Sequence, residues 1–184
     1  MPRRLEAPDP PLADDTIRLE PLTQAHHAAV LALTEDDDVR RFTRVPADGV
    51  DGAFVTNWIA RYERGWEDGT RVAFAILDAR TGEFLGFAAA VDLELEARQA
   101  ELGYMIAPAA RGRGAATRAL ALLTRWCFDA LGLERLELRI DPANESSNRV
   151  AERVGYRREG VLRNMHLKEG LRTDVGVWSR LATE

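Results

Sequence analysis

The chain has 184 residues and a formal net charge of −5, with 46% hydrophobic and 30% charged residues. This size suits one globular domain with a substantial core, and the negative charge argues weakly against nucleic acid as the main partner. A single cysteine, Cys127, excludes an internal disulfide and a cysteine metal cluster, and the three histidines lack metal-ligand spacing.

Targeting signals are also missing from the sequence. No apolar segment approaches the roughly 20 residues of a membrane helix. The start of the chain lacks the apolar core of a signal peptide. We therefore expect a cytoplasmic protein that binds no metal, membrane or nucleic acid.

The first half of the chain predicts a strand, two helices and a hairpin. Residues 1–15 are rich in Pro, Asp and Ala, which is typical of a flexible arm before a single domain at 16–184. Alternating residues at 16–20 predict a strand. Thr23 and Asp51 are plausible N-caps of the two helices that follow. Strands over 71–79 and 83–95 then form a hairpin, in which Gly86 marks a bulge or a close backbone approach.

Two features of this half have two interpretations each. The acidic run at 35–38 is either a solvated helix end, which we favour, or an attractant for a cationic substrate. The aromatic residues of the second helix, at helical spacing, form a stripe that faces the core. Alternatively, Trp58 or Trp66 forms a wall of a substrate pocket.

The segment at 101–121, ELGYMIAPAARGRGAATRALA, predicts an anion site. A strand ends at Pro108, a loop with two arginines and two glycines follows, and small residues begin a helix. Free N–H groups and the dipole at a helix N-terminus favour negative charge, and glycines allow close approach of the backbone. Arginines add charge-assisted contacts. The segment therefore predicts a pyrophosphate site.

The remaining elements complete a predicted order of β-α-α-β-β-β-α-β-α-β-β. The helix at 114–131 has an apolar face that includes Cys127, which we interpret as a buried small hydrophobe. A strand at 133–140, a short helix at 144–155 and two strands around a turn at 168–170 follow. No internal repeat appears.

Several ordered motifs carry a family resemblance. They are TGEFLGF at 81–87, the 100–120 segment with R-x-x-G-x-A, LERLELRI at 133–140, NESSNRVAERVGY at 144–156, and REG followed by VLR at 158–163. The chain resembles the GCN5-related N-acetyltransferase (GNAT) superfamily, in its RimJ/RimL-like branch that acetylates protein N-termini, over residues 16–182. A P-loop is a poor alternative without Gly-Lys-Ser/Thr, and repeated βαβ units of a dinucleotide fold are missing.

The resemblance implies an α/β (α+β) fold and a co-substrate. A mixed, mostly antiparallel twisted sheet of about seven strands would hold a splayed parallel pair at its centre, flanked by about four helices. Acetyl-CoA would bind without a metal, its pyrophosphate in the loop and its pantetheine arm along the strand. The residues implied in binding are Tyr104, Met105, Ile106, Arg111, Gly112, Arg113, Gly114, Ala115, Ala116, Thr117, Asn144 and Ser147.

The resemblance also implies catalytic roles. Glu101 is the candidate base, or an anchor for the amine, with a surface strand residue as the alternative. Ser147 is the candidate acid for the departing thiolate, or merely a helix cap. Tyr104 and Tyr156 are weaker candidates, and a backbone N–H near Met105 is the expected oxyanion donor.

The acceptor stays open at this point. A protein or peptide N-terminus is the leading expectation, and a polyamine, an amino acid or an aminoglycoside is the alternative. A module that binds acyl-CoA without turnover is a second class of function. A homodimer is expected from the resemblance alone.

Overall fold

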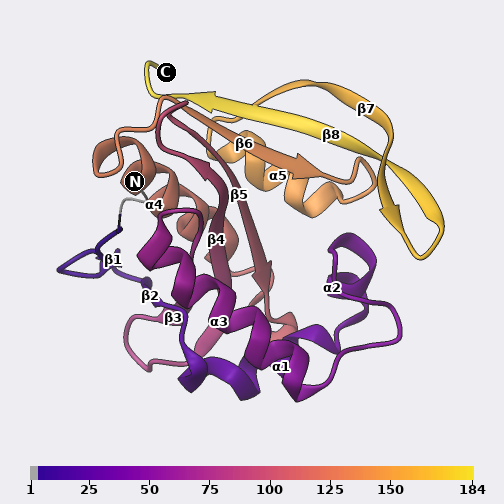
Figure 1. The fold of residues 1–184 in the computed structure, drawn as a ribbon, viewed down its shortest axis with the longest axis horizontal. Coiled ribbons are helices and arrows are strands. Elements are labelled where there is room, and N and C mark those ends of the chain that lie inside the picture. Colours follow the sequence, from indigo (N-terminus) through magenta and orange to yellow (C-terminus); the bar gives the residue numbers. More distant parts are fainter. Residues whose placement is uncertain (1–3) are drawn as a thin grey trace.

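The computed structural model describes residues 4–184, and its centre is a twisted sheet of eight strands (Figure 1). The strands lie in the order β1-β2-β3-β4-β5-β6-β8-β7, and every neighbouring pair is antiparallel except β5 and β6. Their bounds are β1 Leu12–Ala13, β2 Ile17–Pro21, β3 Val72–Asp78, β4 Phe84–Glu94, β5 Gln99–Ile106, β6 Arg135–Ile140, β7 Arg157–Lys168 and β8 Leu171–Leu181.

Helices cover both faces of this sheet. In Figure 1, α1 and α3 lie in front of it and α4 and α5 lie behind. The helical bounds are η1 Gln24–His26, α1 His27–Thr34, α2 Asp37–Phe42, α3 Gly52–Asp68, η2 Pro108–Ala110, α4 Ala115–Asp129 and α5 Glu145–Arg153. The hairpin of β7 and β8 arches away from the sheet toward α2.

Two apolar cores follow from this layering. In β3, Phe74 and Ile76 belong to the core that contains α4, while Ala73 and Ala75 belong to the core that contains α3. Because both faces are covered, β3 is apolar at nearly every position rather than alternating. Cys127 is completely buried in the α4 core, as predicted.

The predicted order of elements is confirmed, with two additions. The six-residue helix α2 and the two-residue strand β1 were not predicted, and β1 makes the sheet one strand larger than the seven expected. Asp51 caps α3 by accepting a hydrogen bond from the N–H of Phe54 at 2.7 Å, as expected.

The segment before residue 16 differs from the expected flexible arm, part of which (residues 1–3) lies outside the described residues. Leu5 is buried and its N–H donates to the carbonyl of Trp66 at 2.8 Å. Asp14 and Asp15 pair with Arg118 of α4. Residues 4–15 therefore pack against the domain.

The parallel pair β5–β6 is the feature that positions the site. Its register runs over only three pairs, from Gln99↔Arg135 to Glu101↔Glu137. Beyond Glu101, β5 stays paired with β4 through Ile106, and β6 stays paired with β8 through Ile140. The two strands therefore diverge, and one edge of β5 has no partner strand after Glu101.

Candidate active site

The loop before α4 is built to receive an anion. Gly112 and Gly114 have φ angles of 74° and 81°, in the left-handed region that favours glycine. No side chain caps the helix at Gly114, and no backbone acceptor within residues 4–184 takes the N–H groups of 112–117. The space beside Gly112 is open, with no atom within 4 Å of a built Cβ. Free donors at a helix N-terminus are the geometry that phosphate groups require.

The side chain of Arg111 extends from this loop to the start of α2. Its guanidinium pairs with Asp36 and, at 3.0 Å, with Asp38 at the start of α2. Asp36 also caps α2 by accepting the N–H of Val39 at 3.0 Å. The acidic run is thus a helix start that holds the phosphate-loop arginine. The sequence suggested either a solvated helix end or an attractant for a cationic substrate, and neither interpretation included Arg111 as a partner.

The unpartnered edge of β5 continues from the loop toward the sheet centre. Tyr104, Met105 and Ile106 pair with β4 on one side and with no strand on the other. Gly86 of β4 lies so close that a Cβ there would stand 2.1 Å from the Met105 carbonyl oxygen. The predicted close approach at Gly86 therefore fixes the course of the strand with the open edge.

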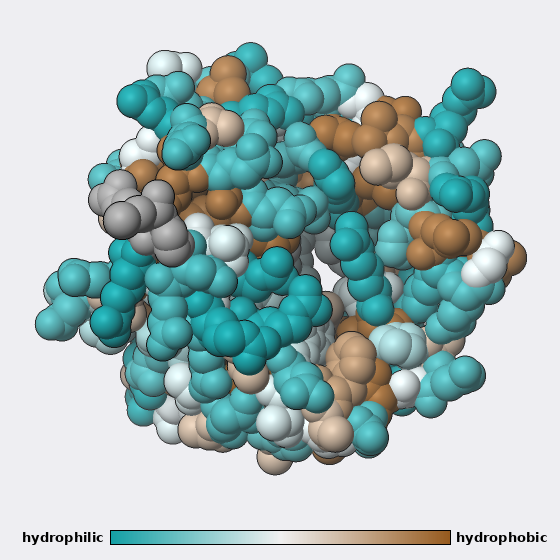
Figure 2. Space-filling model, in the orientation of Figure 1, coloured by the Kyte–Doolittle hydropathy of each residue, from teal (hydrophilic) through white to brown (hydrophobic). Residues whose placement is uncertain are grey.

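A cleft of about 810 Å³ occupies the space between the diverging strands. Its walls come from α3, β4, β5, β6, the start of α5 and the β7–β8 hairpin. Figure 2 shows a deep hollow near the centre of the molecule, with hydrophilic residues around much of its mouth. The cleft brings together Glu101, Tyr104, Met105, Asn144 and Ser147, which the sequence assigned to the site.

Glu101 lies at the apex of the cleft, where the parallel pairing ends. Its carboxylate forms an ion pair with Arg139 of β6 at 3.3 Å. Burial raises the pKa of Glu101, and the charges of Arg139 and Arg44 offset part of that rise. A carboxyl group with a raised pKa is a better proton acceptor than an exposed one.

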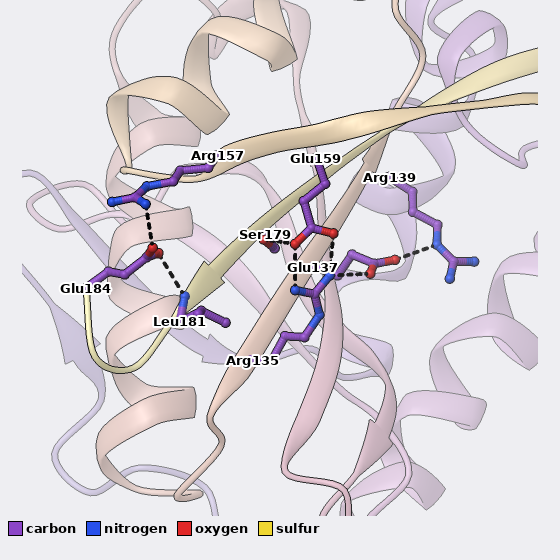
Figure 3. Close-up of polar contacts among 8 residues, drawn as sticks. All are labelled: Arg135, Glu137, Arg139, Arg157, Glu159, Ser179, Leu181 and Glu184. Carbon is purple, nitrogen blue, oxygen red and sulfur yellow. Dashed lines mark hydrogen bonds and ion pairs between the residues drawn. The ribbon is translucent and has the colours of Figure 1, made fainter.

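A ladder of charges across the sheet holds Arg139 in place. Arg139 donates to Glu137 at 2.9 Å, Glu137 accepts from Arg135, and Arg135 donates to Glu159 of β7 at 2.7 Å (Figure 3). Ser179 of β8 also donates to Glu159. These contacts fix the guanidinium that faces Glu101.

Ser147 and Tyr104 meet at the α5 side of the cleft. Asn144 caps α5, because its side-chain oxygen accepts the Ser147 N–H at 3.1 Å. The Ser147 hydroxyl is therefore not the helix cap. The Tyr104 hydroxyl is buried without a hydrogen-bond partner that meets geometric criteria within residues 4–184. Burial raises the pKa of Tyr104 to about 12, and the neighbouring Ser147 hydroxyl opposes this rise.

Comparison with known proteins decides the family. The Acetyltransferase (GNAT) domain family matches residues 16–157. The chain belongs to the GNAT acetyltransferase family. It is 28% identical to the N-acetyltransferase YoaA of Bacillus subtilis over 171 residues, covering 92% of this chain and 96% of YoaA. It is 35% identical to spermidine N(1)-acetyltransferase of Escherichia coli over 81 residues, 44% of each chain.

The fold comparison agrees with this membership. The ribosomal L7/L12 alpha-N-protein acetyltransferase RimL, in complex with coenzyme A, superposes with a TM-score of 0.84 at 19% identity, over 93% of this chain and 96% of RimL. Membership of the family makes the chain an acetyl-CoA-dependent N-acetyltransferase. The predicted GNAT fold and enzyme class are confirmed.

The residues of this GNAT domain fit its co-substrate. The free N–H groups of 112–117 match a pyrophosphate, and the open edge of β5 offers backbone groups to an extended amide chain. Within the described residues no group of three potential metal ligands occurs, and no helix is long and apolar enough to cross a membrane.

Other candidate residues of the sequence lie away from the chemistry. Tyr156 is buried in the core and shares a 2.8 Å hydrogen bond with Thr124, and it does not line the cleft. Burial raises the pKa of Cys127, as expected for a thiol in the core. Trp58 lines the cleft, whereas Trp66 packs edge-on against Phe74 in the α4 core.

The sequence missed three kinds of lining residue. Arg139 was not singled out, although its two-residue spacing from Glu137 places both on one face of a strand. His166 on β7 also lines the cleft, and burial together with Arg44 and Lys168 lowers its pKa, so that the ring is neutral at pH 7. Arginines from α3 and its flanking loops were missed because no local pattern marks them.

Proposed function

We propose that the chain transfers the acetyl group of acetyl-CoA to the primary amine of a protein or peptide N-terminus, by direct attack within a ternary complex. The observation that carries this proposal is the divergence of β5 and β6 after Glu101. That divergence opens one edge of β5 to the acyl donor, and a buried carboxylate lies where the opening begins.

Acetyl-CoA supplies an acyl group activated as a thioester. The backbone N–H groups of 112–117 would hold its pyrophosphate, and the β5 edge at 104–106 would hold its pantetheine arm. A free backbone N–H beside Met105, that of Tyr104 or Ile106 on the open edge of β5, is the proposed donor to the negative charge that develops on the thioester oxygen, because the backbone groups of Met105 itself face β4. Asn144 borders the same space from the start of α5.

Glu101 is proposed to accept the proton that the attacking amine must lose. Its raised pKa suits this role, and Arg139 holds the carboxylate in one orientation. The charge of Arg139 also keeps Glu101 ionised, so the pair combines basicity with a defined position.

Ser147 is proposed to supply a proton to the departing thiolate, with the Tyr104 hydroxyl beside it. Tyr104 stays protonated at neutral pH, and its hydroxyl lacks a partner within residues 4–184. The Ser147 hydroxyl does not serve as the helix cap, because Asn144 caps α5. The hydroxyl groups of Ser147 and Tyr104 are therefore both available at the proposed position of the leaving thiolate, because neither of them serves as a helix cap.

A small amine is the second candidate acceptor, because part of the chain matches a spermidine acetyltransferase. Release of free CoA in the presence of a panel of peptide and polyamine acceptors separates these two candidates.

The decisive experiment compares Glu101→Gln with Glu137→Gln. Both carboxylates contact Arg139, but only Glu101 lines the cleft. Because the ionised form of Glu101 is active, kcat/KM of the wild type should rise with pH through the raised pKa of this residue. Glu101→Gln should lose this rise and about 10²–10⁴-fold in rate, while Glu137→Gln keeps the pH dependence. An intact rise in Glu101→Gln would transfer the role of base to another group, with His166 the first to test.

A further inference from the structure

The acceptor side of the cleft contains three arginines that form no ion pair with a carboxylate of residues 4–184. Arg44 precedes α3, Arg61 lies on α3, and Arg71 directly precedes β3, and all three line the cleft. Their side chains make no hydrogen bond or ion pair within residues 4–184. This contrasts with the net charge of −5 for the whole chain.

The carboxylates of the same lining are largely engaged. Glu101 pairs with Arg139, Asp141 accepts the Ala143 N–H at 2.8 Å, and Asp174 accepts the Asn164 N–H at 2.9 Å. Glu169 accepts the Ala47 N–H at 2.6 Å. Asp92, which is exposed, is the one lining carboxylate without such a contact in the described part of the chain. A hydrogen bond from a backbone N–H leaves a carboxylate charged but holds it on the protein, so within residues 4–184 the lining has three arginines without a polar partner against one such carboxylate.

Two other basic side chains of the cleft lining already interact with the protein. Lys168 donates to the carbonyls of Arg40 and, at 3.1 Å, of Thr43. Arg41 stacks over the ring of Phe42 at 4.9 Å. The lack of a partner at Arg44, Arg61 and Arg71 is thus a local property rather than a general feature of the surface.

The three arginines act on the interior of the cleft. Arg44 is close enough to lower the pKa values of Glu101 and His166. Arg71 and Arg61 oppose the rise in the pKa of Tyr62 that burial causes. Arg71 is half-buried, and a partly desolvated guanidinium without a protein anion is suited to an anion from a ligand.

Helix α3 adds an apolar wall beside this charge. Phe54, Asn57, Trp58 and Arg61 lie at spacings of three and four residues and face the cleft together. The rings of Phe54 and Trp58 are 6.0 Å apart in an edge-on arrangement, and Trp58 meets Phe87 in the same way at 5.4 Å. An acceptor could place apolar atoms on these rings and an anionic group at Arg61.

We infer that the acceptor is an amine whose molecule also carries a carboxylate, and that Arg61 and Arg71, assisted by Arg44, select it. This inference rests on the proposed function and specifies its substrate class. The carboxylate comes either from an acidic side chain near a peptide N-terminus or from the α-carboxylate of a free amino acid. Glu101 receives the amine and the arginines receive the acid, so a polyamine is disfavoured at this site.

The test is a comparison of kcat/KM among acceptors at saturating acetyl-CoA. The panel consists of three peptides of equal length, amidated at the C-terminus to remove its carboxylate, with a common first residue and acidic, neutral or basic residues after it, together with free glutamate, free alanine and spermidine. At least one carboxylate-bearing acceptor should exceed the basic peptide and spermidine by about 10-fold or more, and 0.5 M salt should reduce the preference. The peptides and the free amino acids show which source of carboxylate is used.

Variants locate the preference in the cleft. Arg61→Gln and Arg71→Gln should each raise KM for the acidic acceptor about 5- to 10-fold more than KM for the neutral peptide, with a smaller effect on KM for acetyl-CoA. Arg71→Lys should restore part of the effect. Arg64→Gln is the matched control, because Arg64 lies on the same helix outside the cleft lining.

The outcomes separate the two proposals. Acetylation of acidic and basic acceptors at equal rates, or a preference for spermidine, overturns the charge selection and leaves the acetyltransferase function intact. An equal loss for all acceptors in Arg61→Gln and Arg71→Gln also overturns it. Acetylation of none of these amines overturns both.

Discussion

Replacing Gly86 with alanine tests whether β4 sets the geometry of the strand that receives the acyl donor. Gly86 pairs with Ile106 and has a φ of 150°, a conformation that side chains rarely adopt. A Cβ at this position would lie 2.1 Å from the Met105 carbonyl oxygen. The added methyl group therefore meets backbone, which cannot rotate away as a side chain can.

The expected cost follows from that distance. An ordinary contact begins at 3.4 Å, so the two backbones must separate by roughly 1.3 Å. Strain at such a φ costs about 1–3 kcal/mol, and forced displacement of packed strands costs a similar amount. We expect the free energy of unfolding of Gly86→Ala to fall by about 2–4 kcal/mol. A shift of about 1 Å in the β5 edge that is proposed to hold the acyl donor should also lower kcat on the order of 10²-fold.

Urea unfolding followed by circular dichroism gives the stability, and CoA release gives the rate at a temperature where the variant is folded. Gly160→Ala in β7 is the control, because no atom lies within 4 Å of its built Cβ and its φ is not in the left-handed region. A Gly86→Ala protein with the stability and kcat of the wild type would refute the argument that close approach at this residue fixes β5.

Three further predictions concern the loop, the α5 cap and the charge ladder. Gly114→Trp should raise the dissociation constant for CoA at least about 10-fold in calorimetry while the fold persists, because the added indole enters open space. An unchanged affinity for CoA would contradict the loop assignment. Asn144→Ala should lower the unfolding free energy by about 1 kcal/mol, and a neutral result would mean that its bond to the Ser147 N–H contributes little. Hydrogen bonds from Arg135 and Ser179 lower the pKa of Glu159 to about 2. The stability that this ionised carboxylate contributes is present above about pH 4.5 and is lost as the pH falls toward 2. Glu159→Gln should therefore lower the free energy of unfolding by about 1 kcal/mol at pH 7, after allowance for the exposure of the side chain, and should not change it at about pH 2. Urea titrations at the two pH values measure both effects.

The fold was predictable where its signals are local. The glycine-rich loop, the cap at Asp51 and the apolar face of α4 depend on neighbouring residues in the sequence, whereas Thr23 precedes the short helix η1 and makes no side-chain cap bond. Helix α2 was not predictable from periodicity, because six residues are too few to show it. Its formation is supported by the cap at Asp36 and by the ion pairs with Arg111, which lies far along the chain.

The sequence predicted several of the residues that the cleft brings together, but not the contacts that those residues make. Family motifs indicated Glu101, Tyr104 and Ser147, and the cleft does bring them together. The partner of Glu101 depends on the register of two strands separated by a helix, and no local pattern fixes that register. The selective arginines come from three separate elements, so only the tertiary structure places them around one cavity.

Helix α2 joins the two halves of the site. At its start, Asp36 and Asp38 hold Arg111 of the phosphate loop. Near its end, the carbonyls of Arg40 and Thr43 accept from Lys168 at the tip of the β7–β8 hairpin. The contacts of one short helix thus connect the proposed loop for the acyl donor with the hairpin that borders the cleft.

The opening of the sheet and the basicity of Glu101 have a common origin. The last parallel pair sets Glu101 opposite Glu137, and like charges in such a pair destabilise a sheet. Arg139 contacts both carboxylates and offsets that repulsion at the point where pairing stops. Beyond it, no strand of residues 4–184 covers this edge of β5, and Glu101 lies half-buried at the apex of the cavity that results. A register one pair longer would cover the edge that is proposed to hold the acyl donor, so the length of the parallel pair determines both the cleft and the position of the proposed base.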